Sequence, residues 1–331
     1  MGGRDQHDRE PVAGAGPWRL AWRRLRRSRT ALGFGALFLT LVAVAAAAPV
    51  WAEVAGRGPL ANNAVGTIEA NGRETEVVSP DGVPIGPQWG AEYFLGADGN
   101  GRDVMVRLLY AARNSLLIGV SAALITSVLS VVVGLLAGYF RGPVDSIVRP
   151  ALDVIWAFPV VLLGVALGTA LALGGLQVGP IEISGRSKVI PIFVIAVVYV
   201  PYMARPIRGL ALSLREKEYI EAARAMGAGP WRTMFSEVLP NLSSTIVVFF
   251  PLMVANAILL EAALSFLGAG VRAPEPSWGN MIDQGVELIV TAPHQAIAPG
   301  LMLLLTVLAL NAFGDGVRDA LDPRARVRIE H

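Results

Sequence analysis

The chain has 331 residues, of which 53% are hydrophobic and 16% are charged. Soluble domains carry about 25% charged residues, so this composition and a mean hydropathy of +0.53 indicate a membrane protein rather than a globular enzyme. The absence of Cys excludes disulfides, thiol catalysis and Cys-ligated metal sites, and the three His are scattered without metal-ligand spacing. All but two of the 28 basic residues are Arg, mostly in loops, which is a topology signal rather than a nucleic-acid-binding surface.

Residues 1–30 form a basic N-terminal segment that we expect to be cytoplasmic. Residues 1–17 are polar and predicted to be disordered. Trp18–Thr30 carries six Arg with Trp and Leu between them, typical of a segment that lies against anionic lipid. Residues 31–52 are uncharged and long enough to be the first membrane span. A cleaved signal peptide is the alternative, but the apolar run exceeds the about 7–15 residues of a signal-peptide core.

Residues 53–114 form a polar loop with eight acidic and five basic residues, predicted to be extracytoplasmic. Asn71-Gly72 and Asp81-Gly82 are turn signals, so a small β-hairpin is expected within residues 67–84. The Gly- and Asp-rich run at 95–104, LGADGNGRDV, is only a weak candidate for a calcium loop. It lacks the alternating ligands and the closing Glu of an EF-hand.

Residues 115–314 are predicted to be the core of the protein and to hold five further spans. The second span covers 115–140, where Gly134 and Gly138 either permit close helix approach or are incidental in a lipid-facing helix. A short charged loop at 141–153 precedes a third span at 154–176, in which Pro159 predicts a kink. A polar excursion at 177–188 leads into a short fourth span at 189–204.

The polar segment 205–241 lies between two apolar runs. Tyr219–Met226 is rich in helix-forming residues, and Gly227 and Gly229-Pro230 then break the helix. Trp231–Glu237 is predicted to form a second short helix, which Leu239-Pro240 would end. The resulting helical hairpin is suited to binding in a groove of another protein. The alternative is a solvated loop without a partner.

The fifth span covers 242–267 and contains Glu261, with Asn256 a little over one turn earlier. A carboxylate within a span is costly, so Glu261 and Asn256 are candidates for a transport pathway or gate. We slightly favour the alternative, in which Glu261 lies near the outer interface and is hydrogen-bonded to a neighbouring helix. A Pro-rich loop at 269–293, a sixth span at 296–313 and a cytoplasmic tail at 315–331 follow. With the N-terminus inside, 20 of the 28 basic residues are on the inner side, in agreement with the positive-inside rule.

Four stretches carry a resemblance to a known family. Glu221-Ala222-Ala223, Gly227 and Leu239-Pro240 resemble the EAA loop of permeases of ATP-binding-cassette importers. Three further stretches resemble the dipeptide/oligopeptide/nickel branch of that family: residues 95–104, the EAALSFLG and SWGNM segments at 261–268 and 277–281, and the tail at 311–324. The resemblance covers residues 94–324. It departs from the family pattern at Glu237, where an aliphatic residue is usual and where Val238 is instead one place later.

The resemblance implies an all-α membrane protein with six transmembrane helices, the type I (MetI-like) importer permease fold, and a small extracytoplasmic insertion between helices 1 and 2. Glu221 would fix the hairpin by polar contacts, Ala222 and Ala223 would allow close approach of a partner, and Gly227 would supply the turn. The implied partners are a second related permease, two cytoplasmic ATPase subunits and an extracytoplasmic solute-binding protein, and this chain itself would be a multi-pass protein of the cytoplasmic membrane with both termini in the cytoplasm. The chain lacks GxxxxGK[ST], so ATP would bind the partner subunits, and no cofactor, metal or nucleic acid is expected on this chain.

Peptides are the expected substrate, with nickel or another solute as the alternative. A stand-alone secondary transporter would require charged residues paired across the mid-membrane, and Glu261 is the sole candidate for one. A membrane enzyme is disfavoured because no Ser/His/Asp grouping, metal motif or paired carboxylates lie in or beside a span.

Overall fold

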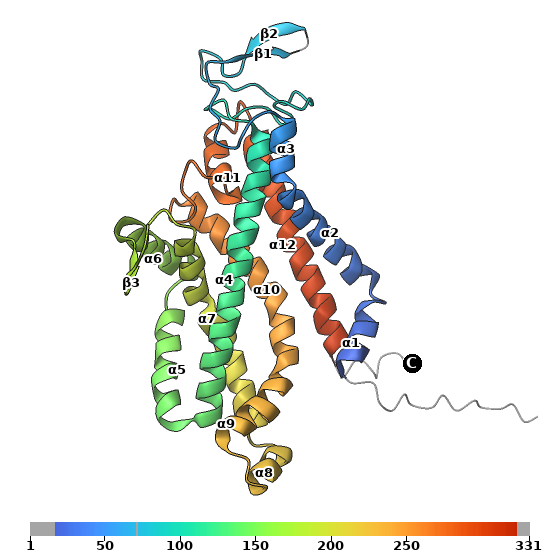
Figure 1. Ribbon diagram of the computed structural model, residues 1–331, viewed down its shortest axis with the longest axis vertical. Helices are drawn as coiled ribbons and strands as arrows, with labels where there is room; N and C mark the ends of the chain where they lie inside the picture. The colour runs from blue at the N-terminus through green and yellow to red at the C-terminus, as the bar shows by residue number, and fades with distance from the viewer. Residues whose placement is uncertain (1–16, 71, 323–331) are drawn as a thin grey trace, which may run out of the picture.

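The computed structural model describes residues 17–70 and 72–322 (Figure 1). Over these residues the chain is mostly helical, with two small antiparallel hairpins, β1–β2 and β3–β4. The first helices in the chain are α1 (Pro17–Leu25), α2 (Arg29–Ala46), α3 (Ala48–Val54), α4 (Val104–Phe140), α5 (Gly142–Trp156), α6 (Val160–Gly174) and α7 (Val189–Leu214). The later helices are α8 (Glu218–Ala225), α9 (Pro230–Thr233), the π-helix η1 (Met234–Val238), α10 (Leu239–Phe266), α11 (Trp278–Glu287) and α12 (His294–Leu321).

Five helical segments within the described residues are long and apolar enough to cross a membrane. They are α2, α4, α7, the continuous segment Pro230–Phe266 that includes α10, and α12. The helices α5 and α6 make a sixth span when they are counted together, with a bend of 94° between them. The prediction of an all-α protein with six spans and a kink at Pro159 is therefore confirmed.

The first span is divided in two near its C-terminal end. Ser28 caps α2 by accepting a hydrogen bond from the Ala31 N–H. The helix ends at Ala47 and resumes as α3, because Pro49 lacks the N–H needed to continue the ladder and fits in the first turn of a new helix. The predicted span 31–52 thus covers most of α2 and α3. The predicted disorder of residues 1–17 lies almost wholly outside the described residues.

The β-hairpin predicted within residues 67–84 is confirmed. β1 (Thr67–Ala70) pairs with β2 (Arg73–Glu76), and Gly72 has a φ of +74° that suits the turn between them. A small cluster of buried Val77, Tyr93 and Ala97 supports this insertion from beneath.

The second span begins earlier than predicted. Asp103 caps α4 by accepting from the Val106 N–H, so the last residues of the predicted loop 53–114 are helical. Burial raises the pKa of the Asp103 carboxyl, and the backbone N–H groups of Val106 and Tyr93 oppose that shift. The apolar run in the sequence predicted where the span lies, but the helix itself begins at its capping residue, several residues before that run.

The helices α4 and α7 pack closely against each other at four successive positions. The partner residue on α7 advances with the residue on α4, so the two helices are parallel. Thr126 and Ser130 donate to the carbonyls of Ala196 and Val200, both with an offset of 70 residues. At Gly134 and Gly138 an added Cβ would lie 2.6 Å from the carbonyl oxygens of Ala204 and Arg208. The two glycines are therefore not incidental, because they allow the α7 backbone to approach α4.

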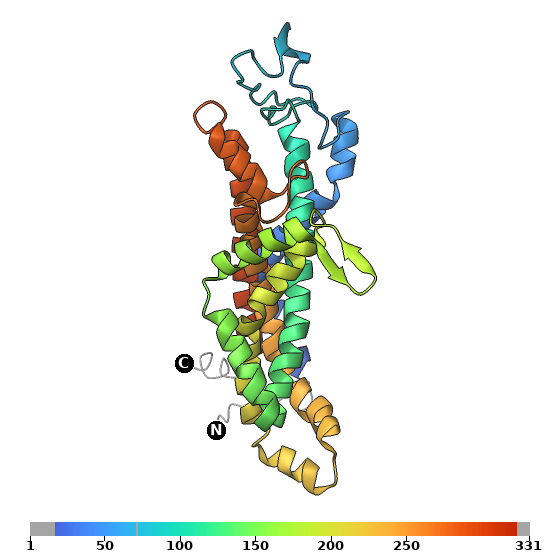
Figure 2. The same ribbon diagram turned by 90° about the vertical axis from the view of Figure 1, so that its left-hand side faces the viewer.

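The predictions for the third span and its flanking loops require two corrections. Residues 141–153 were expected to be a loop, but they form most of the helix α5, which has Pro143 in its first turn. The chain leaves this helix before Pro159, because a residue preceding Pro is disfavoured in the α-helical conformation. The expected polar excursion at 177–188 contains the hairpin of β3 (Leu176–Val178) and β4 (Ile181–Ile183), which projects from the side of the molecule (Figure 2).

The C-terminal part is more helical than predicted. The Pro-rich loop at 269–293 contains α11, which begins with a capping box formed by Ser277 and Asn280 and buries Trp278 completely. The helix α12 extends beyond the predicted end of the sixth span to Leu321, so the start of the predicted tail is helical. Residues 323–331, which include the end of the family-like tail, lie outside the described residues.

Candidate functional site

The hairpin predicted between the fourth and fifth spans is present at the end of the molecule opposite β1 and β2 (Figure 1). The helix α8 ends in a turn in which Gly227 has a φ of +88°. The Ala228 N–H donates to the Ala223 carbonyl, a five-residue step typical of a glycine-terminated helix. Gly227 thus occupies a backbone conformation that an L side chain rarely adopts.

The second arm of the hairpin does not end at Leu239-Pro240, and the prediction that it does is wrong. The helix continues from Pro230 to Phe266. It passes Pro240 because one turn of π-helix precedes the proline, with the Leu239 N–H bonded to the Met234 carbonyl. The wider turn leaves the backbone free to accommodate a residue without an N–H. The hairpin is consequently joined rigidly to α10.

Buried apolar side chains join the two arms of the hairpin. Ile220, Met234 and Val238 are all fully buried. Partial burial and the nearby Glu237 carboxylate raise the pKa of the Tyr219 hydroxyl. Val238 thus provides the buried aliphatic side chain, one position after the place where the family pattern has it.

The hairpin also rests on the end of α4, a contact that was not predicted. The Arg224 guanidinium lies 5.4 Å from the Tyr139 ring centroid, and the Trp231 ring lies 5.1 Å from that of Phe140. Arg215 donates to the Tyr139 carbonyl at 2.6 Å. The sequence did contain a signal for this contact, because two aromatic residues, Tyr139 and Phe140, stand together at the end of the second span.

The hairpin exposes large apolar side chains among charged ones such as Glu218, Glu221 and Arg232. Met226 is 83% exposed, and Trp231 and Phe235 are 56% and 55% exposed. Glu221 and Ala222 are exposed and Ala223 is half-buried. No hydrogen bond or ion pair joins the Glu221 carboxylate to residues 17–70 or 72–322, so its predicted role in fixing the hairpin is not supported.

Glu261 and Asn256 lie far from the hairpin on α10. A rise of 1.5 Å per residue separates Leu239 from Glu261 by about 33 Å. Glu261 is fully buried and accepts a hydrogen bond of 2.6 Å from Ser265, one turn later on the same helix, and its carboxylate also faces the hydroxyls of Ser115 on α4 and Ser277 at the start of α11. Asn256 is half-buried, and its carbonyl accepts from the Tyr199 hydroxyl. Glu261 therefore lies inside the helical packing of this chain in this conformation.

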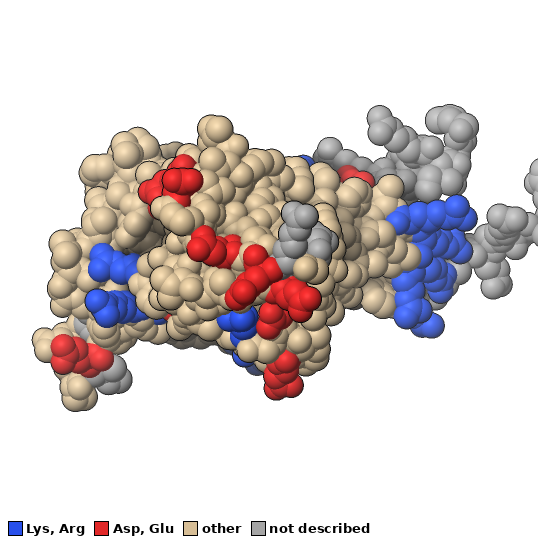
Figure 3. All heavy atoms as spheres, turned by 90° about the horizontal axis from the view of Figure 1, so that it is seen from above, with Lys and Arg blue, Asp and Glu red and all other residues tan. Residues whose placement is uncertain are grey.

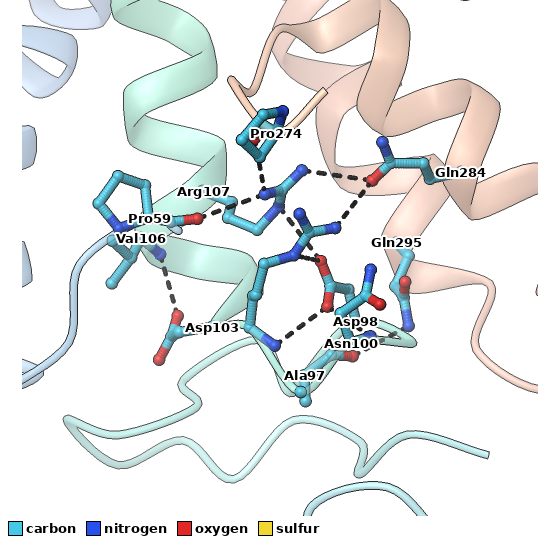
Figure 4. Close-up of polar contacts among 12 residues, drawn as sticks. Pro59, Ala97, Asp98, Asn100, Asp103, Val106, Arg107, Pro274, Gln284 and Gln295 are labelled. Carbon is cyan, nitrogen blue, oxygen red and sulfur yellow. Dashed lines mark hydrogen bonds and ion pairs between the residues drawn. The ribbon is translucent and has the colours of Figure 1, made fainter. Parts of the chain in front are cut away.

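A buried ionic cluster at the end of the molecule that carries β1 and β2 was not recognised from the sequence (Figure 4). Asp98 accepts from Arg102 Nε at 2.8 Å and pairs with Arg107 Nε at 3.2 Å. Both guanidinium groups donate to the Gln284 side-chain oxygen on α11. Arg107 also donates to the carbonyls of Pro59 and Pro274. The Asp98 carboxylate is thus occupied by arginines, which argues against the calcium-loop interpretation.

Comparison with known proteins agrees with this geometry. Residues 130–327 match the family model described as the binding-protein-dependent transport system inner membrane component. Residues 16–62 match the N-terminal transmembrane domain of oligopeptide transport permease C.

Curated relatives match over nearly the whole chain. The glutathione transport system permease protein GsiD of Pectobacterium atrosepticum is 37% identical over 94% of this chain and 92% of its own. The same protein of Escherichia coli O157:H7 is 36% identical over 94% of this chain and 91% of its own. The dipeptide transport system permease protein DppC of Alkalihalophilus pseudofirmus is 34% identical over the same shares. A chain of the inward-facing MetNI methionine ABC transporter shares the fold, with a TM-score of 0.53 and 19% identity over 65% of this chain and 97% of that one.

The helical architecture and the external hairpin define a multi-pass membrane permease. The chain belongs to the family of inner-membrane components of binding-protein-dependent transport systems. It is therefore an inner-membrane protein and a permease of the ATP-binding-cassette importer type, a class that works with ATPase and solute-binding partners.

Proposed function

We propose that this chain is the permease subunit through which ATP hydrolysis in two separate cytoplasmic subunits drives peptide uptake. The exposed apolar tip of the hairpin, formed by Met226 and Phe235, carries the proposal. Large apolar side chains exposed together, with Glu221 and Ala222 beside them, fit a helix-in-groove contact with another protein. A second related permease and an extracytoplasmic solute-binding protein complete the proposed assembly.

The hairpin transmits motion to three helices. It continues rigidly into α10, is joined to α7 at Arg215, and rests on the aromatic end of α4. Closure of the ATPase subunits would displace the hairpin and tilt these helices together. The substrate path through the membrane would then switch between inward- and outward-facing states, because the ATPase subunits would make different contacts with the hairpin in each state. This chain supplies the moving helices and no nucleotide site.

The proposed orientation places the hairpin and both chain ends in the cytoplasm. The described ends of the chain lie close together, since Arg24 donates to the Asp322 carbonyl at 2.9 Å. The opposite end carries the acidic insertion, and acidic side chains predominate near the centre of the view onto that end (Figure 3). The excess of Arg on the hairpin side supports this orientation by the positive-inside rule.

The proposed substrates are short peptides, since the curated relatives are named for transport of glutathione and dipeptides. Competition for uptake in cells that express the complete transporter tests this proposal. Labelled glutathione and a labelled dipeptide should enter only when this chain is present. Uptake of a nickel chelate in place of both peptides would overturn the peptide assignment and leave the permease role intact.

The coupling role is tested by substitution of two neighbouring glycines. Gly227→Val places a branched side chain at a φ of +88°, whereas Gly229 has a φ of −69° and tolerates Val. An added Cβ meets no atom within 4 Å at either position, so the two variants differ in backbone strain and not in crowding. Gly227→Val should abolish uptake while the protein stays in the membrane, and Gly229→Val should retain it.

Normal uptake by Gly227→Val would contradict the coupling role of the hairpin. Purification of the chain together with its ATPase subunits provides a second check. If the purified chain transports peptide without any nucleotide-hydrolysing partner, it is instead a stand-alone transporter.

A further inference from the structure

An apolar groove opens between α1, α4, α10 and α12, and the permease role does not account for it. Its volume is about 660 Å³ and its walls are almost wholly apolar. The walls are formed by side chains from all four helices, among them Trp22, Leu25, Val128, Val247, Phe250 and Phe313. An apolar cavity of this size beside membrane-spanning helices is suited to hydrocarbon rather than water.

The groove continues into a polar mouth. A second cavity of about 430 Å³ shares Trp18, Ala21, Ala320 and Leu321 with the groove, so the two are contiguous. The polar residues of its lining are Arg24, Asn241, Ser243 and Ser244. Its lining includes no Asp or Glu. The combined site is therefore apolar along its length. At one end it carries the guanidinium group of Arg24 together with the amide of Asn241 and the hydroxyls of Ser243 and Ser244.

The charge around the mouth is strongly positive. Residues 19–29 contain six Arg, and all of them except the half-buried Arg24 are exposed. A large patch of basic side chains lies at the right-hand side of Figure 3, the side on which α1 lies in Figure 1. Asp315 and Asp319 on α12 are exposed, but at 100° per residue they point away from the groove face that contains Val317. They do not neutralise the mouth directly, and Asp322, whose carbonyl accepts from Arg24 at 2.9 Å, is outnumbered there by the six arginines of residues 19–29.

We propose that this groove binds one anionic phospholipid, with an acyl chain between α4, α10 and α12 and the phosphate at Arg24, Ser243 and Ser244. Hydroxyl and guanidinium donors are well suited to phosphate oxygens. Neighbouring arginines on α1 favour an anionic headgroup over a zwitterionic one. An apolar helix of a partner permease would cover the walls, but it would bring no negative charge to a mouth at which arginines outnumber Asp322. The orientation proposed above places this lipid in the cytoplasmic leaflet.

A lipid in this position would join α1 to the beginning of α10. Asn241 in the mouth follows Pro240 directly, so the headgroup would lie beside the base of the hairpin. The basic N-terminal segment would then hold α12 and α10 together through the lipid, in addition to its direct bond from Arg24 to Asp322.

Native mass spectrometry of the complete transporter tests the proposal. The complex is extracted from membranes that contain phosphatidylglycerol and phosphatidylcholine, and the lipids that remain bound are identified. The Val247→Trp variant fills the groove, and Val161→Trp on α6 is its control, because both valines are 40% exposed and Val161 lies outside the groove. The wild type and Val161→Trp should retain one more phosphatidylglycerol than Val247→Trp, whose occupancy should fall at least tenfold.

A second pair of variants tests the headgroup contact independently of packing. Arg24→Gln should lower phosphatidylglycerol occupancy at least tenfold, whereas Arg24→Lys, which keeps the charge, should retain it. Similar retention of phosphatidylcholine and phosphatidylglycerol by the wild type would overturn the proposal. So would unchanged retention in Val247→Trp, or efficient cross-linking of Val247→Cys to the partner permease. Failure of these tests leaves the coupling role untouched, since that role rests on the hairpin tip.

Discussion

At the scale of single residues, glycines and one carboxylate determine how the two ends of the helices pack. Gly134 and Gly138 permit the approach of α7 to α4, and Asp98 neutralises two buried arginines at the end that carries β1 and β2. The costs of changing these residues differ in kind. An added methyl group at a glycine causes overpacking, whereas loss of the carboxylate leaves buried positive charge without a partner.

Gly138→Ala should destabilise the protein although Ala is the better helix former. The added Cβ would lie 2.6 Å from the Arg208 carbonyl oxygen and 2.7 Å from Ala211 Cβ, and backbone atoms cannot move aside cheaply. We expect a cost of about 1–3 kcal/mol. Gly209→Ala on α7 is the control, because nothing lies within 4 Å of its Cβ and helix propensity should stabilise it by up to about 1 kcal/mol. Thermal unfolding in detergent should shift in opposite directions for the two variants.

Asp98→Asn should be more damaging than any loss of a surface ion pair in this chain. It leaves the buried Arg102 and Arg107 without their counter-charge, for an expected cost of about 3–5 kcal/mol. Glu92→Gln is the control, because Glu92 is half-exposed and pairs with Arg57 at 3.7 Å, and its loss should cost less than about 1 kcal/mol. Equal unfolding temperatures for the two variants would show that the cluster does not stabilise the outer end.

At the scale of elements, the hairpin and the end of α4 form one unit. The contacts of Arg224 and Trp231 with Tyr139 and Phe140 join segments that are more than 80 residues apart in sequence. If these segments move together during transport, a covalent link between them should be harmless. The chain has no native Cys, so an introduced pair can be linked selectively.

Phe140→Cys and Trp231→Cys, joined by a short bismaleimide, should transport peptide at nearly the rate of the unlinked double variant. The rings of the two native residues are 5.1 Å apart, so the reagent spans the gap without displacing either helix. The unlinked double variant and each single variant are the controls. A block of uptake that appears only after linking would mean that the hairpin moves relative to α4, and would leave α7 and α10 as its transmitting helices.

Elements differ in how far the sequence predicted them. The spans and the break at Gly227 followed from runs of apolar residues and from a glycine, both of which act locally. The helices α5 and α11 were missed because charged or Pro-containing segments form helices that a hydropathy pattern does not detect. The turn of π-helix before Pro240 and the pairing of Asp98, Arg107 and Gln284 depend on backbone and tertiary contacts that no local pattern encodes. The location of the candidate hairpin was thus predictable, but its support by α4 was not.

At the scale of the whole molecule, the two ends differ in charge. The end with the hairpin carries the arginines of α1, and the opposite end carries the acidic insertion of β1 and β2. The apolar helices between them leave no other arrangement across a bilayer than one end on each side. The orientation of the chain is therefore known once an experiment shows which of the two ends faces the cytoplasm.

Labelling of introduced cysteines in intact cells should make that choice. Val65 in the insertion and Met226 at the hairpin tip are 102% and 83% exposed, so Val65→Cys and Met226→Cys should react freely with a maleimide that reaches them. In intact cells a membrane-impermeant maleimide, given access to the outer face of the cytoplasmic membrane, should label Val65→Cys only. Met226→Cys should become labelled after the membrane is permeabilised, and its protection by added ATPase subunits would locate the docking surface as well. Labelling of Met226→Cys without permeabilisation would invert the topology, and a hairpin on the outer face could not be moved by a cytoplasmic ATPase.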